Sequence, residues 1–171
     1  MDIEIKEATT IDIAAIKQMA ETVFRKTYKP ILSWEQIEYM IEWMYSTESL
    51  ERQFEEGHVF FIAFSEETPC GYVSIQKETA EYDDVNVYHL HKLYVMPHMQ
   101  GNGVGKQLFN RACSHAKKNA SVASIRIELN VNRNNKAVEF YKRIGMNIVN
   151  EGNFPIGNGY YMNDYIMGIE L

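Results

Sequence analysis

The strongest indication of the fold is a glycine-rich turn between a predicted β-strand and an amphipathic helix. Apolar residues recur at helical spacing after the turn, for example at Leu108, Phe109 and Ala112. Glycines leave backbone N–H groups accessible to a ligand, and a helix start adds unpaired N–H donors and the positive end of the helix dipole. The turn therefore predicts a phosphate or pyrophosphate site. It consists of Gln100, Gly101, Asn102, Gly103, Val104, Gly105 and Lys106.

Two common phosphate-binding loops do not match this turn. A dinucleotide fingerprint requires a third glycine at Lys106 or at Leu108, depending on where the count begins. A Walker-type loop ending at Gly105-Lys106 requires Gly in place of Gln100 and Ser or Thr in place of Gln107. On this stretch alone, a purely structural turn remains the alternative.

The remaining periodicity predicts alternating strands and helices. An N-cap at Thr9 precedes a helix broken at Pro30, Ser33 opens a second helix with a capping-box pattern, and Gly57 suits the end of a third. No repeat or linker appears, so we expect residues 1–171 to form a single α/β domain with a mixed sheet between helices. Strands are expected near 3–5, 59–64, 71–76, 85–95, 125–131, 146–150 and 161–171, and helices near 13–29, 33–45, 47–56, 103–118 and 134–144.

Composition excludes several other classes of protein. The 23 acidic residues outnumber the 17 Lys and Arg residues, and the net charge of −6 argues against a nucleic-acid-binding surface. No apolar run reaches the roughly 18–20 residues of a membrane span, and the N-terminus is typical of a strand rather than a signal peptide. Cys70 and Cys113 are too few for a disulfide framework or a zinc site. We therefore expect a cytoplasmic protein without a metal.

Two sequence blocks carry a resemblance to a known family. Leu-Tyr-Val-x-Pro followed by Gln-x-x-Gly-x-Gly, at residues 93–105, resembles the CoA-pyrophosphate loop of the GCN5-related N-acetyltransferase (GNAT) superfamily. Residues 134–146 resemble the family segment Asn-x-x-Ala-x-x-x-Tyr-x-x-x-Gly-Phe, with Met146 where Phe is usual. The resemblance implies an acetyl-CoA-dependent N-acetyltransferase without a metal. It also implies a mostly antiparallel sheet of six or seven strands flanked by helices.

The resemblance further implies roles for individual residues. The strand end formed by Leu93, Tyr94 and Val95 splits from its neighbour, so that its free backbone groups bind pantetheine and stabilise the oxyanion. Tyr141 matches the tyrosine that protonates the departing sulfur, although its position also suits a core aromatic beside Phe140 and Ile144. Asn134 is expected to contact CoA and to cap its helix, and Ala137 is expected to contact CoA.

The sequence offers three candidates for the general base, which are His89, His91 and a water chain. His89 and His91 lie two residues apart on the predicted strand and therefore share a face. The family often has a glutamate at the position matching His91, and histidine has an ordinary pKa near 6.5 that suits proton transfer at neutral pH. Structural histidines, or a metal pair lacking a third ligand, are the alternatives.

The acceptor in this family is usually set by the first two helices and by loops near the C-terminal strands. Carboxylates and aromatic faces on the second helix can hold a cationic amine, although an ordinary amphipathic helix shows the same pattern. The layout is similar to bacterial acetyltransferases that act on polyamines such as spermidine and spermine. We therefore predict a small primary amine as the acceptor, bound by Tyr28, Glu38, Glu42 and His91.

Two other functions fit the same motifs. Protein or peptide N-acetylation would need an open groove beside the sulfur, and a non-catalytic CoA-binding regulatory module would need no acid. Tyr141 in its matching position argues against the second. Edge strands and an aromatic helix are also compatible with a homodimer.

Overall fold

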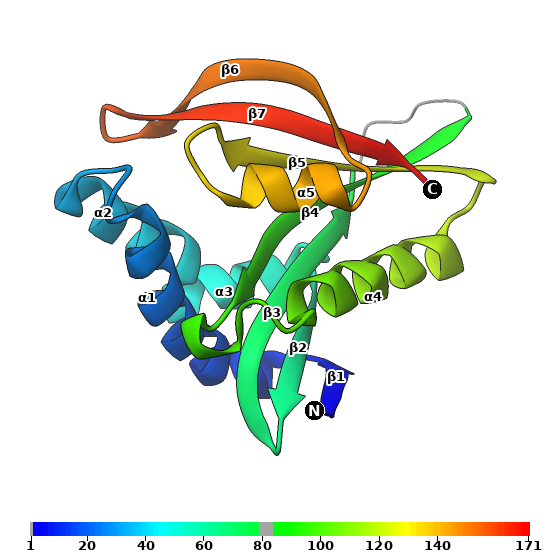
Figure 1. Ribbon diagram of the computed structural model, residues 1–171, viewed down its shortest axis with the longest axis horizontal. Helices are drawn as coiled ribbons and strands as arrows, with labels where there is room; N and C mark the ends of the chain where they lie inside the picture. The colour runs from blue at the N-terminus through cyan, green and yellow to red at the C-terminus, as the bar shows by residue number, and fades with distance from the viewer. Residues whose placement is uncertain (1, 79–83) are drawn as a thin grey trace.

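Strands and helices alternate in the predicted order in the computed structural model, which describes residues 2–78 and 84–171 (Figure 1). The strands described are β1 (Ile3–Glu7), β2 (Val59–Ser65), β3 (Thr68–Lys77), β4 (Val85–Val95), β5 (Ser124–Asn132), β6 (Asn147–Gly157) and β7 (Tyr160–Glu170). The α-helices are α1 (Ile13–Tyr28), α2 (Trp34–Tyr45), α3 (Thr47–Glu55), α4 (Val104–Asn119) and α5 (Ala137–Arg143), with short 3-10 helices η1 (Thr10–Asp12) and η2 (Pro97–Met99).

Within the described residues the strands form one seven-stranded sheet in the order β1-β2-β3-β4-β5-β7-β6. Neighbouring strands are antiparallel, except that β4 and β5 run parallel. A parallel pair requires a long crossover, and α4 supplies it. The predicted mixed, mostly antiparallel sheet flanked by helices is confirmed.

Helices cover the two faces of the sheet and bury a core on each. On one face α1, α2 and α3 pack against β2 and β3 around residues such as Ile16 and Tyr72. On the other face α4 and α5 pack around residues such as Leu108 and Ile127. Figure 1 shows α1 and α2, in blue, on one side of the central strands and α4, in yellow-green, on the other.

Local capping explains where the first helices begin and end. Thr9 and Asp12 form a reciprocal capping box that leads through η1 into α1. The Ser33 hydroxyl accepts from the Gln36 backbone N–H at 3.2 Å, as the sequence predicts. The Gln36 side chain does not complete that box, because it donates to the Tyr161 carbonyl at 2.8 Å and so ties α2 to β7.

The structure corrects three expected boundaries. The helix expected from Asn134 begins at Ala137, and the residue before it, Lys136, makes no side-chain cap. The strand expected near 146–150 continues to Gly157, because it stays paired with β7 as far as Tyr160. The strand expected near 71–76 begins earlier, at Thr68, and includes Pro69.

The helices of the described residues include none that is both long enough and apolar enough to cross a bilayer.

Candidate active site

The central feature of the site is a split between the parallel strands β4 and β5. Their described pairing runs from Val85 to His89 on β4 and from Ser124 to Glu128 on β5, and it stops there. Beyond these residues β4 remains paired with β3, and β5 with β7. A cavity of about 670 Å³ occupies the split. Its walls come from both strands, the glycine-rich turn, α5 and the end of α1.

The unpaired edges of the split strands supply main-chain groups to this cavity. Leu93, Tyr94 and Val95 line it from β4, and Leu129, Asn130 and Val131 line it from β5. In a parallel sheet each edge presents alternating N–H and C=O groups to its neighbour. Where the neighbour has turned away, these groups are available to an extended, amide-containing ligand.

The glycine-rich turn leads into α4 at one end of the cavity. Gly101 and Gly103 adopt left-handed backbone conformations, with φ of +81° and +79°, which favour glycine. The Gln100 side chain donates to the Val95 carbonyl at 3.0 Å and thereby closes the turn onto β4. Gly103 is the N-cap of α4 and provides no side-chain cap, so the first N–H groups of this 16-residue helix remain available to an anion.

Gly105 keeps the start of α4 close to α5. A β-carbon at this position would lie 3.3 Å from the Phe140 ring and 3.7 Å from Val95. The first N–H groups of α4 therefore lie beside the segment that carries Tyr141. The predicted turn residues Gln100, Gly101, Gly103, Val104, Gly105 and Lys106 all line the cavity, whereas the Asn102 side chain donates to the Met99 carbonyl at 3.2 Å and stabilises the turn.

Replacing Gly103 with Val is expected to weaken CoA binding at least about tenfold, because a β-branched residue is strongly disfavoured at a positive φ and would reorient the N–H groups of the turn. Gly159 is a matched control, since it has the same φ of +79° and open space around it but lies in the turn between β6 and β7. Isothermal titration calorimetry with CoA measures both variants. Equal affinities for the Gly103→Val and Gly159→Val proteins would contradict a CoA-binding role for the turn.

Tyr141 lies on α5 and lines the cavity. Its side chain is 5% exposed, and Phe140 and Ile144, expected to be the core residues of this helix, are less buried. Burial, followed by the nearby Tyr28, raises the pKa of Tyr141 above its ordinary value. The phenol therefore stays protonated at neutral pH and is present as an O–H donor that can supply a proton to a departing sulfur.

The turn before α5 is held by asparagine side chains. Asn132 accepts from the Asn134 backbone N–H, and Asn135 accepts from the Ala137 backbone N–H, each at 2.9 Å. The expected capping role of Asn134 is wrong, because α5 begins at Ala137 and its N-cap residue is Lys136. Asn134 and Ala137 both line the cavity.

A β-bulge in β4 determines where the histidines point. Ser74 of β3 pairs with Lys92 and the next residue, Ile75, pairs with Leu90, so His91 is an extra residue in β4. His91 lines the cavity and lies against His89, with a distance of 4.6 Å between ring centroids. The two histidines expected to share a face are adjacent, but His89 is not part of the cavity lining and its Nδ1 lies 3.4 Å from the Glu78 carboxylate.

Hydrogen bonds determine which nitrogen of His91 carries the proton. Gln76 donates through Nε2 to the Glu56 carbonyl at 2.9 Å, so its Oε1 faces His91 and can only accept. The His91 Nε2 lies 2.9 Å from this oxygen and is therefore the N–H donor. The Nδ1 of the neutral ring keeps its lone pair and is the atom that can accept a proton.

The surroundings also keep His91 neutral. Partial burial, then His89, His58 and Lys92, lower the pKa of His91 below its ordinary value, although the residue is exposed to solvent. His58 stacks on His91 with centroids 4.4 Å apart, and burial lowers the pKa of His58 to about 4. Neither ring carries a charge at neutral pH.

The sequence did not predict that Lys92 and His58 lie beside His91. Strict alternation places Lys92 on the sheet face opposite His91, but the bulge turns both side chains to the same face. Lys92 is buried, donates to Gln53 Oε1 at 2.7 Å and lies over the rings of Tyr45 and Phe60. Lysine is rarely buried without a partner, and nothing in the local sequence signals the bulge.

The predicted acceptor residues separate into two groups. Tyr28 lies at the end of α1, lines the cavity and accepts from the Asn135 amide at 3.3 Å. Glu38 and Glu42 do not line the cavity. Glu38 instead forms a bidentate pair with Arg25, at 2.8 and 3.0 Å, because its face of α2 packs against α1. Glu42 is exposed on the same helix, so the structure does not bring either carboxylate to the cavity.

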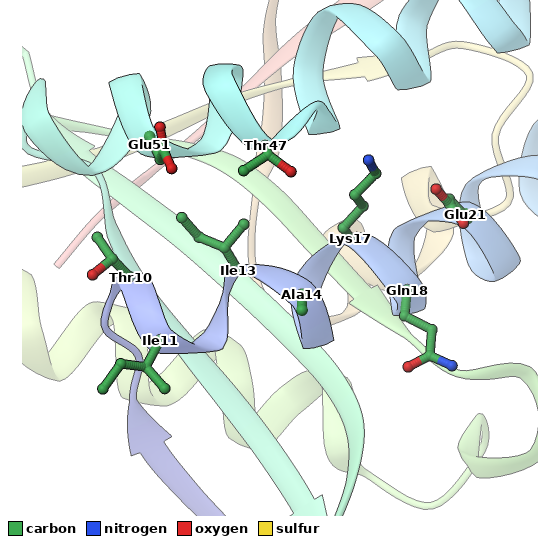
Figure 2. A pocket seen from close by; sticks show the side chains of 9 residues that line it. All are labelled: Thr10, Ile11, Ile13, Ala14, Lys17, Gln18, Glu21, Thr47 and Glu51. Atoms are coloured by element: carbon green, nitrogen blue, oxygen red, sulfur yellow. The ribbon is translucent and has the colours of Figure 1, made fainter.

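A second hollow, of about 460 Å³, lies between η1, α1 and α3 (Figure 2). Its rim carries Lys17, Glu21 and Glu51, with Thr10 and Ile11 at one end. Its lining shares no residue with the cavity in the split and contains no glycine-rich turn. We therefore locate the candidate active site in the split. Among residues 2–78 and 84–171, no cluster of three His, Cys, Asp or Glu side chains is arranged to hold a metal ion.

The fold and site define a protein that binds an extended, phosphate-bearing cosubstrate between two diverging strands, and comparison with known families agrees. The model of the Acetyltransferase (GNAT) family matches residues 25–146, well over half of the chain. The chain therefore belongs to this family. The predicted GNAT fold, acetyl-CoA as cosubstrate and the class of N-acetyltransferases are confirmed at the level of the family.

Individual relatives are similar over different lengths. The PaiA N-acetyltransferase of Thermoplasma acidophilum, solved in complex with coenzyme A, is 26% identical, with full coverage of both chains and a TM-score of 0.78. A GCN5-related N-acetyltransferase of Rhodopseudomonas palustris is 19% identical, with 100% and 97% coverage and a TM-score of 0.79. An uncharacterised N-acetyltransferase of Methanocaldococcus jannaschii is 34% identical over 98 residues, which are 56% of this chain and 41% of that protein.

Proposed function

We propose that this chain transfers the acetyl group of acetyl-CoA to a small primary amine, with polyamines such as spermidine and spermine as the acceptor class. The observation that carries the proposal is the cavity in the split. It joins the glycine-rich turn at one end to Tyr141, His91 and Tyr28 in a single continuous space. In this proposal residues 1–171 act as one catalytic domain.

The similar proteins support the proposal to different degrees. The relative of known structure with 26% identity is a PaiA N-acetyltransferase bound to coenzyme A, which supports CoA as the occupant of this cavity. The neighbours below 25% identity include a ribosomal-protein alanine N-acetyltransferase and an N-acetyltransferase bound to a peptide-derived analogue, and they support the fold alone. They do not decide between a small amine and a peptide as the acceptor.

The site residues suit a direct transfer. The acceptor nitrogen attacks the thioester carbonyl to form a tetrahedral oxyanion, which then collapses to the amide as the C–S bond breaks. His91 Nδ1 takes the proton that the nitrogen loses, directly or through a water molecule. The Tyr141 hydroxyl donates a proton to the departing CoA sulfur, and a main-chain N–H on the free edge of β4 stabilises the oxyanion.

Replacing His91 with Ala is expected to lower kcat/KM for the amine by about 10²-fold at about pH 7, because a positioned base typically contributes this much. The lowered pKa of His91 means that the wild-type base stays unprotonated well below pH 6.5. The ratio of wild-type to variant activity should therefore stay nearly constant between about pH 6 and pH 9, because the base is unprotonated throughout and the ionisation of the amine, with a pKa of about 10, affects both proteins equally. A pH series of kcat/KM measures this ratio.

Two further histidine variants make this test specific. His89→Ala separates the two candidate bases, and His115→Ala removes a histidine of α4 that lies outside the cavity lining. Equal kcat/KM for the wild-type and His91→Ala proteins, or a larger loss for His89→Ala than for His91→Ala, would contradict the assignment of His91.

The proposed function is tested by thiol release from acetyl-CoA across a panel of amines. The panel contains spermidine, spermine, free amino acids and short peptides with a free N-terminus. Turnover concentrated on the polyamines supports the proposal. Turnover on the peptides alone would indicate that protein N-termini are the acceptors. Tight CoA binding without thiol release on any amine would indicate a non-catalytic CoA-binding module.

A further inference from the structure

The hydroxyl of Tyr28 is held between two walls of the cavity. Tyr28 is the last residue of α1 and lines the cavity. Its oxygen accepts from the Asn135 side-chain amide at 3.3 Å, and Tyr94 of β4 hydrogen-bonds to the same hydroxyl. Asn135 and Tyr94 also line the cavity. The tip of the Tyr28 side chain therefore lies between the segment before α5 and the free end of β4.

These neighbours determine where the proton of Tyr28 points. The Asn135 Oδ1 accepts from the Ala137 backbone N–H at 2.9 Å, so the Nδ2 of this amide faces Tyr28 and can only donate. Burial raises the pKa of Tyr28 and of Tyr94. Their mutual hydrogen bond lowers the pKa of Tyr28 and raises that of Tyr94, as expected when Tyr94 donates. The Tyr28 oxygen thus accepts two hydrogen bonds, and its own O–H remains to donate into the cavity.

The nearby acid limits which atom of the cosubstrate this O–H can reach. Tyr28 lies close enough to Tyr141 to contribute, after burial, to raising the pKa of the Tyr141 phenol. In the proposed function Tyr141 protonates the departing sulfur, and the acetyl carbonyl carbon is bonded directly to that sulfur. A hydroxyl beside Tyr141 is therefore also beside the thioester carbonyl.

The chemistry of the transfer decides which partner suits an O–H donor at this place. Donation to the reacting nitrogen would engage the lone pair that must attack. Donation to the carbonyl oxygen assists the reaction, because negative charge develops there as the N–C bond forms. We propose that Tyr28 is a catalytic residue whose O–H, together with the main-chain N–H of β4, stabilises the oxyanion until the C–S bond breaks. The phenol keeps its proton throughout, and the inference rests on the proposed function.

Replacing Tyr28 with Phe is expected to lower kcat by about 10²- to 10³-fold, as for loss of one oxyanion donor. The KM for the amine should stay within about threefold, because the interaction is made mainly in the transition state. Hydrolysis of acetyl-CoA without amine should fall in parallel, since attack by water forms the same kind of oxyanion. A raised KM with unchanged hydrolysis would make Tyr28 an acceptor-binding residue and overturn the proposal.

Tyr39 offers a matched control for this substitution. Its hydroxyl donates to the Ile156 carbonyl at 2.8 Å, and it lies outside the cavity lining. Tyr39→Phe therefore removes a bonded phenol away from the proposed chemistry. Both transfer and hydrolysis should stay within about twofold of the wild-type rates, because the lost bond affects stability rather than the reaction. Equal losses in the two variants would contradict a specific role for Tyr28.

Infrared spectroscopy tests the hydrogen bond without any acceptor. Acetyl-CoA labelled with carbon-13 at the carbonyl is bound to the wild-type and Tyr28→Phe proteins, and the carbonyl stretching band is compared. A donated hydrogen bond weakens the C=O bond, so the band should lie at higher frequency in the variant. An unchanged band overturns the role of Tyr28, and so does acetyl-CoA that fails to bind the wild-type protein. A wild-type protein that shifts the band but acetylates no amine defeats the proposed function alone.

A second variant covers the case in which Tyr28→Phe does not fold. Asn135→Asp keeps an oxygen for the Ala137 N–H but offers Tyr28 a carboxylate in place of a donor. The Tyr28 O–H should then turn towards this carboxylate, and kcat should fall at least about tenfold. Where Tyr28→Phe does fold, adding Asn135→Asp to it should cost less than about threefold further, because both changes remove the same interaction. An unchanged kcat in Asn135→Asp, or fully additive losses, would overturn the proposal.

Discussion

Replacing Tyr141 with Phe is expected to lower kcat by about 10²- to 10³-fold while leaving CoA affinity within about threefold of the wild-type value. The substitution removes only the hydroxyl that protonates the leaving sulfur, and a positioned general acid typically contributes this much. The ring is retained, so the packing of α5 is preserved. Steady-state kinetics with acetyl-CoA and calorimetry with CoA measure the two effects separately.

A second buried tyrosine provides the control for this substitution. The Tyr72 hydroxyl donates to the Tyr45 hydroxyl at 2.8 Å in the core beneath α1–α3, outside the cavity lining. Tyr72→Phe therefore removes a buried phenol without touching the proposed chemistry and should keep kcat within about twofold, because the lost bond affects stability rather than the reaction. An unchanged kcat in Tyr141→Phe, or an equal fall in both variants, would contradict the assigned acid.

Replacing Lys92 with Met is expected to stabilise the protein at low pH, by roughly 2–4 kcal/mol at about pH 6. Burial lowers the pKa of Lys92 from 10.5 to about 7. Because the unfolded chain binds a proton more tightly than the folded one, the protonated lysine disfavours folding. This cost is complete below about pH 7 and disappears as the pH rises towards 10.5. Urea denaturation over this range measures the free energy of unfolding.

The sign of the effect should change within the same pH series. Above about pH 9 the wild-type lysine is neutral and bonded to Gln53, so Lys92→Met leaves a buried acceptor without a donor and should be neutral or destabilising by about 1 kcal/mol. Lys118→Met, an exposed change on α4, should show no such dependence on pH. A constant difference between wild-type and Lys92→Met proteins would show that the lysine stays charged in the fold.

Local patterns were sufficient to predict most of the fold. The Thr9 and Ser33 caps, Gly57 at the end of α3 and the glycines of the turn each act through backbone geometry within a few residues, so sequence spacing reveals them. The end of β6 was missed because it depends on pairing with β7 rather than on its own residues. Strand length is a property of two segments together.

The site was predictable where it depends on the main chain and less so where it depends on contacts between distant side chains. Tyr28, His91 and Tyr141 all reach the cavity, as expected from their positions. Glu38 does not, because Arg25, thirteen residues earlier, neutralises it across two helices. The bulge that turns Lys92 inward is a shift in the pairing register between β3 and β4. Such a shift depends on both strands and cannot be predicted from the sequence of β4 alone.

The split between β4 and β5 also has a consequence for how the protein avoids aggregation. Free strand edges are templates on which other chains add strands, and proteins generally shield them. Here the free edges of the split are interior walls that face each other across a cavity bordered by α5, the end of α1 and the glycine-rich turn. The protein thus keeps unsatisfied main-chain groups for an extended ligand without presenting them to a neighbouring molecule. Since those groups belong to the backbone, side chains along both walls can vary while the cavity keeps its capacity to bind.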